Sequence, residues 1–112
     1  MSNPPLSSVA GWCSAYRESL PALSSPNPDG KELEFLDLYV ARYTLLGGDT
    51  EGVPSSATTA MQRLAAAYAA IRQRVAAGEQ LASVLQSIFA DPQSELILAG
   101  TAVDDEVAKI CS

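Results

Sequence analysis

Apolar residues recur at steps of three and four along most of the chain, which is the spacing of one face of an α-helix. Segments rich in proline, glycine, serine and aspartate separate these stretches. The pattern predicts helices over about residues 6–20, 30–46, 54–77, 80–90 and 92–110. Residues 1–5 are a proline-rich lead-in, so we expect a single helical domain over residues 6–112.

Local signals mark the ends of several predicted helices. Asp29 is a predicted N-cap, and Glu32 three residues later completes the spacing of a capping box. Both residues at 47–48 are glycine, and they are predicted to end the second helix. Asp91 is expected to cap the last helix, with Pro92 in its first turn.

The third stretch carries a long apolar stripe and is rich in alanine. The stripe comprises Ala57, Met61, Leu64, Tyr68, Ile71 and Val75. Its spacing is that of a heptad seam, but it is shorter than a sustained coiled coil requires. We therefore expect an all-α fold, a compact antiparallel bundle of four or five helices with short connections.

Cys13 and Cys111 are the only cysteines, and each falls on the apolar side of a predicted terminal helix. If they are joined, the first and last helices must be neighbours, because a disulfide requires Cα atoms within about 7 Å of each other. Closing a loop of this length contributes about 4–5 kcal/mol in the chain-entropy model, and the bond would imply an oxidising compartment. The alternative is two unrelated buried thiols. We favour the disulfide because of the even number, the terminal placement and the matching helix faces.

Two stretches around these cysteines carry a resemblance. They are residues 12–16, Trp-Cys-Ser-Ala-Tyr, and residues 102–112, an acidic stretch with valine and alanine that contains the second cysteine. Together with Gly-Val-Pro at 52–54, this layout resembles small secreted or lipid-anchored helical proteins of actinobacteria. The resemblance implies a place outside the cytoplasm and assigns no functional residue. Residues 1–6 lack the basic and apolar regions of a signal peptide. The sequence is therefore also compatible with a protein that stays inside the cell.

Composition narrows the set of partners. The net charge is −6, and the seven lysines and arginines are scattered along the chain. Nucleic acid is not an expected partner, because its binding depends on neutralising many phosphates. No apolar run approaches the roughly 20 residues that span a bilayer, so we predict no membrane span.

The chain has no histidine, which is the commonest general base and metal ligand in proteins. A Ser-His or Cys-His nucleophile therefore cannot form within one chain. Two distant cysteines do not make a zinc site by themselves. We predict no catalytic residue, no metal and no cofactor.

The second predicted helix gives the strongest interaction signal, because its apolar residues occupy more than one side. Such a helix is either central in the core or covered by a partner or a second copy. The candidate interaction surface comprises Phe35, Tyr39, Arg42, Tyr43, Met61 and Phe89.

Arg42 lies between two tyrosines of that helix and has two interpretations. Its guanidinium could bind an anionic ligand or stack on Tyr39 or Tyr43. More ordinarily it pairs with a nearby carboxylate, and we expect Asp37 or Glu34 to serve.

The sequence thus predicts a non-enzymatic, extracytoplasmic helical-bundle protein that acts through a protein partner or as a homodimer. One alternative is a cytoplasmic acidic adaptor or regulator of the immunity type, which would bind a basic partner. Another is a carrier of a small apolar ligand, since alanine-rich walls leave space between helices.

Overall fold

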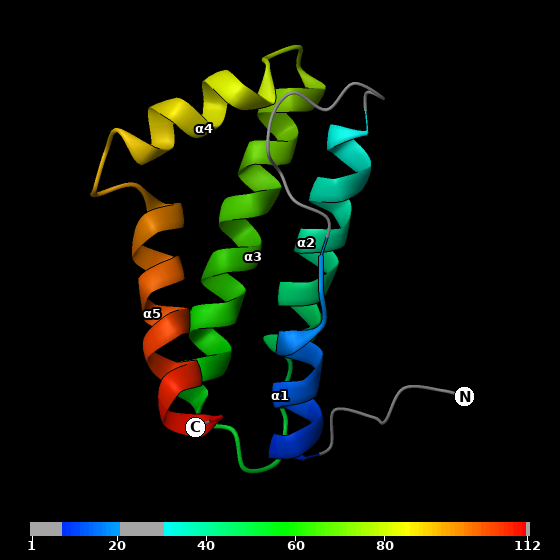
Figure 1. Ribbon diagram of the computed structural model, residues 1–112, viewed down its shortest axis with the longest axis vertical. Coiled ribbons are helices and arrows are strands. Elements are labelled where there is room, and N and C mark those ends of the chain that lie inside the picture. Colours follow the sequence, from blue (N-terminus) through cyan, green and yellow to red (C-terminus); the bar gives the residue numbers. More distant parts are fainter. Residues whose placement is uncertain (1–7, 21–30, 112) are drawn as a thin grey trace.

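The longest helix, α3 (Ser55–Ala76), lies at the centre of the molecule. In the computed structural model, α2 (Glu32–Leu46) packs along one side of it and α5 (Glu95–Ile110) along the other (Figure 1). Both neighbours run antiparallel to α3. Several alanines of α3 are buried, and their small side chains let the flanking helices approach closely.

Two shorter helices complete the described part of the chain, which consists of residues 8–20 and 31–111. Helix α1 (Val9–Arg17) lies at the end of the bundle where α5 finishes, and α4 (Leu81–Phe89) crosses the opposite end (Figure 1). We call these the cysteine end and the α4 end. The described residues form five helices and no strand, which confirms the all-α bundle.

Several predicted helix boundaries are correct and others are wrong. Gly47 caps α2 as expected, whereas α1 ends at Arg17, three residues early, because Glu18 adopts an extended conformation. The proposed role of Asp29 lies outside the described residues. Helix α5 does not begin at Pro92, because a turn intervenes: the Asp91 carboxylate accepts a hydrogen bond from the Gln93 N–H at 3.0 Å. The chain becomes helical only at Glu95.

The disulfide between Cys13 and Cys111 joins α1 to the end of α5, with the two Cα atoms 5.8 Å apart. The predicted adjacency of the first and last helices is therefore confirmed. A guanidinium N–H of Arg17 also donates to the Cys111 carbonyl at 2.6 Å. Two independent links thus hold α1 to α5 at the cysteine end.

Trp12 anchors the other side of α1. Its side chain is completely buried, and its indole N–H donates to the Leu46 carbonyl at 2.9 Å. That carbonyl belongs to the last residue of α2, where helical carbonyls have no partner within the helix. The indole therefore fills the core and satisfies a helix end at the same time.

The helix at the centre of the core is α3, not the second helix. On α2 only Leu36 and Leu46 are fully enclosed, while Leu38 and Leu45 are 47% and 57% exposed. The apolar residues that wrap around α2 are thus divided between the core and the surface.

Removing the disulfide tests its contribution to stability. We expect the double variant Cys13→Ala/Cys111→Ala to lose about 4–5 kcal/mol of unfolding free energy, since the bond closes nearly the whole chain. Urea unfolding followed by circular dichroism measures this loss. Dithiothreitol should lower the stability of the parent protein by a similar amount and leave the double variant unchanged. Equal midpoints for oxidised and reduced parent protein would show that the link contributes nothing.

Replacing the indole tests the bond to α2. We expect Trp12→Phe to cost at least about 1–3 kcal/mol, because the Leu46 carbonyl loses its donor inside the core. The control is Tyr16→Phe, which removes an exposed, long hydrogen bond to Asp104 and should cost less than about 0.5 kcal/mol. Comparable losses in chemical denaturation of the two variants would contradict this account.

Candidate functional site

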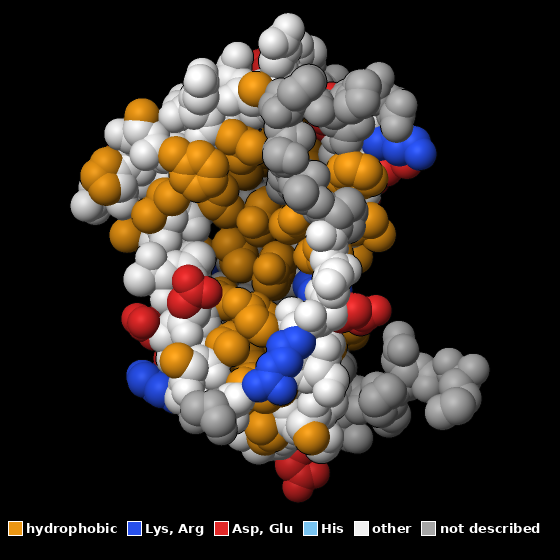
Figure 2. Space-filling model, in the orientation of Figure 1, with side chains coloured by type: hydrophobic (Ala, Val, Ile, Leu, Met, Phe, Trp, Pro, Cys, Tyr) orange, Lys and Arg blue, Asp and Glu red, His pale blue; other side chains and the backbone are white. Residues whose placement is uncertain are grey.

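A groove of about 340 Å³ opens on the face between α5 and α2, with α3 as its floor. Helix α1 covers this face only at the cysteine end, and α4 crosses it only at the other. Figure 2 shows apolar side chains gathered in the hollow between them. The residues that line it include Tyr16, Tyr43, Leu64, Tyr68, Phe89 and Asp104. Every helix therefore contributes to this site.

Three tyrosines pack together along the α2–α3 side. The Tyr43 and Tyr68 rings are stacked, with centroids 5.7 Å apart and planes 9° apart. Tyr39, one turn before Tyr43 on α2, meets Tyr68 with ring centroids 4.9 Å apart and a tilt of 51°. Both arrangements are favourable for aromatic pairs. Tyr43 and Tyr68 line the groove and form its aromatic wall, and Tyr39 packs against Tyr68.

Burial disfavours ionisation of these hydroxyls. It raises the pKa of Tyr43 to about 12, and it also raises the pKa of Tyr68. The pKa of Tyr39 is also raised by burial, against the opposing charge of Arg42. For Tyr16, burial and the Asp104 carboxylate both raise the pKa. The wall is thus uncharged over the physiological range.

One carboxylate, Asp104 of α5, is the only charged side chain among the described residues that line the groove. Its Oδ1 lies 3.5 Å from the Tyr16 hydroxyl, which donates to it. Ring faces and a carboxylate therefore meet at the end of the groove nearest α1.

Arg42 does not line the groove, and the expected pairing with Asp37 or Glu34 was wrong. It donates to the Tyr16 carbonyl at 3.3 Å and lies 3.9 Å from the Glu18 carboxylate. The reason is the packing of α1 on α2, which brings these oxygens within reach. Asp37 instead forms an ion pair with Arg72 of α3.

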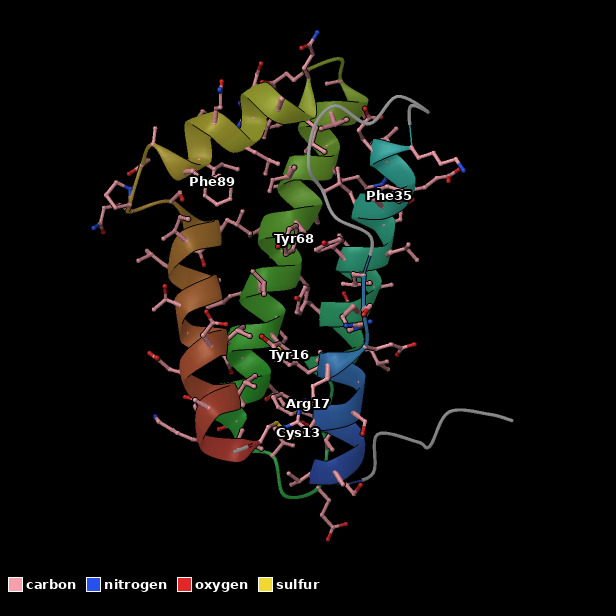
Figure 3. The ribbon with its side chains drawn as sticks, viewed as in Figure 1. Cys13, Tyr16, Arg17, Phe35, Tyr68 and Phe89 are labelled. Atoms are coloured by element: carbon pink, nitrogen blue, oxygen red, sulfur yellow. A yellow bond between two sulfur atoms is a disulfide. The ribbon has the colours of Figure 1, made fainter. Side chains whose placement is uncertain are left out.

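The structure brings only part of the predicted interaction surface together at the groove. Tyr43 and Phe89 line the groove, and Phe89 is 63% exposed at the end of α4. Phe35 lies near the start of α2, away from Phe89 (Figure 3). Met61 is completely buried and is a core residue.

Three important groove residues were absent from that predicted surface. Figure 3 shows Tyr68 between Tyr16 and Phe89 along the same face. Tyr68 belongs to the predicted apolar stripe of the third helix. Tyr16 and Asp104 belong to no predicted site, and each lies in a stretch that carries the resemblance. Their shared location follows from contacts between distant segments, for which the sequence carries no local signal.

A second hollow, of about 390 Å³, lies between α2 and α3. Small and uncharged residues line it, namely Val40, Thr44, Gly47, Gly48, Gln62, Ala65, Ala66 and Ala69. It lacks the aromatic rings and the carboxylate of the first groove. The first groove is therefore the better candidate for specific binding.

Within residues 8–20 and 31–111 there is no group of three or more histidine, cysteine, aspartate or glutamate side chains placed to hold a metal. No helix in the same residues is both long and apolar enough to cross a bilayer. No protein-family model, curated protein or solved structure matches the chain, so no residue role is transferred to it from a relative.

The raised tyrosine pKa values predict how stability depends on pH. An unfolded tyrosine ionises near pH 10, below the folded pKa of Tyr43, about 12. The stability linked to this group should therefore be complete below pH 10 and fall as the pH rises toward 12. Urea midpoints between pH 8 and 12 measure this decline, and absorbance at 295 nm reports the ionisation.

The matched variant for that measurement is Tyr43→Phe, which keeps the ring and removes the ionisable hydroxyl. It should show a shallower decline above pH 10. All tyrosines of the folded protein titrating together near pH 10 would contradict the enclosed aromatic wall.

Proposed function

We propose that this protein is a non-enzymatic binding protein whose groove receives an apolar segment of a partner protein. The observation that carries this proposal is the aromatic groove, with Phe89 standing 63% exposed at its margin. Exposing a large aromatic ring beside other apolar groups is unfavourable in water, and such patches mark interaction sites. Interface anchors are also enriched in aromatic residues.

The openness of the groove favours a partner's side chains over an enclosed small molecule. Small-molecule sites usually bury about 70–90% or more of the ligand's surface. This groove is a hollow on one face of the molecule (Figure 2). An apolar face of another protein would cover it and Phe89 together.

The same proposal places the protein outside the cytoplasm. The disulfide supports this, because such bonds persist in secreted proteins and in the cell envelope and are rare in the cytosol. The resemblance to secreted or lipid-anchored actinobacterial proteins agrees with this placement. Alkylation and mass spectrometry of protein from its native host test it: alkylated cysteines without prior reduction would support the cytoplasmic alternative.

Selection from a random library tests the binding function. Displayed 16-residue peptides would be selected on the oxidised protein, and their affinities measured as free synthetic peptides. We expect apolar peptides whose dissociation constants rise about tenfold or more on Phe89→Ser, since truncating an aromatic anchor typically costs more than 1 kcal/mol. Being well exposed, Phe89 can be replaced without loss of the fold.

Leu45→Ser is the matched control, because Leu45 is similarly exposed, at 57%, and does not line the groove. Peptide affinities should not change in this variant. Selected peptides that respond equally to both substitutions, or to neither, would refute the groove as the binding site. Sedimentation showing a dimer that Phe89→Ser dissociates would instead assign the groove to a second copy. Fatty-acid binding that none of the selected peptides inhibits would favour the alternative of a carrier for a small apolar ligand.

A further inference from the structure

We infer that the partner segment carries a basic side chain, lysine or arginine, which enters the groove at its α1 end beside Asp104. This inference rests on the proposed function and adds the chemistry and orientation of the partner. Its basis is the meeting of one carboxylate with the rings of Tyr16 and Tyr43 in the same groove.

The charge of Asp104 is not neutralised by any other described side chain. Its one hydrogen bond comes from the neutral Tyr16 hydroxyl, at 3.5 Å. Within residues 8–20 and 31–111, no lysine or arginine forms an ion pair with it. A cation placed there would therefore gain an interaction without breaking an existing pair.

The two arginines nearest this end are turned to other oxygens. Arg42 is held between the Tyr16 carbonyl and Glu18, and only 10% of its side chain is exposed. Arg17 donates to the Cys111 carbonyl beyond the groove. Neither guanidinium lines the groove. Asp104 is exposed at this end of the groove, so a basic side chain of a bound partner could reach it.

The neighbouring rings strengthen the preference for a cation. Tyrosine faces attract lysine and arginine through their negative quadrupole. The Tyr43 hydroxyl is neutral at ordinary pH, as tyrosine hydroxyls are, and burial raises its pKa to about 12, so no phenolate competes for the cation. The rest of the groove is apolar and leads toward Phe89. A segment with a basic residue at one end and apolar residues along its length matches this arrangement.

The test uses synthetic peptides from the selection whose binding depends on Phe89. We expect each to contain a lysine or arginine, and its replacement by glutamine should weaken binding to the parent protein about tenfold, the order of a partly desolvated cation–π and carboxylate contact. On Asp104→Asn the same replacement should weaken binding only about threefold, because the contact with the tyrosine rings remains and the carboxylate is gone.

Asp105→Asn is the matched control, because it makes the same change in net charge at an exposed neighbour outside the groove. It should preserve the tenfold effect. If both variants reduce the effect equally, a general acidic field explains the preference and the inference fails. It also fails if groove-dependent peptides lack basic residues. The absence of any peptide sensitive to Phe89→Ser would overturn the proposed function itself.

Discussion

The attachment of α1 to the cysteine end of the bundle determines the shape of the rest. A nine-residue helix is not stable alone, so α1 depends on its contacts with the other helices. The disulfide and Arg17 tie it to α5, and the Trp12 indole ties it to the end of α2. All of these links lie near one end of the molecule. Helix α1 therefore covers this face of the described residues only at that end.

The groove is a consequence of this arrangement. Helices α2, α3 and α5 form one layer, and a layer of helices buries its apolar side only where something packs on it. Helix α1 does so at one end and α4 at the other. Between them, the stacked rings of Tyr43 and Tyr68 line the groove. The described part of this surface is thus largely apolar and aromatic, which suits the binding of a partner.

The sequence predicts the helices better than it predicts the site. Apolar spacing locates the helices, and the terminal cysteines predict the neighbours of α1, because both signals are local or covalent. The ends of the helices were less predictable. Asp91 was expected to cap α5, but its carboxylate instead accepts a hydrogen bond within a turn that precedes the helix. Met61 was assigned to a surface because residue type does not reveal which face of α3 is covered.

The site itself depends on packing between distant segments. Tyr16 and Asp104 lie 88 positions apart and meet only because α1 and α5 are joined. Arg42 was expected to pair within its own helix, but it pairs with Glu18, since α1 packs on α2. No spacing in the sequence specifies either contact.

Paramagnetic relaxation by a soluble nitroxide, followed in the NMR spectrum of the oxidised protein, tests most directly whether the groove is open to solvent. The account predicts strong broadening of the Phe89 ring signals and weaker broadening of Tyr68. It predicts almost none for the Met61 methyl group or the Trp12 indole, which are completely buried. Phe89 signals as protected as those of Met61 would contradict it, because the groove would then be closed and unable to receive a partner.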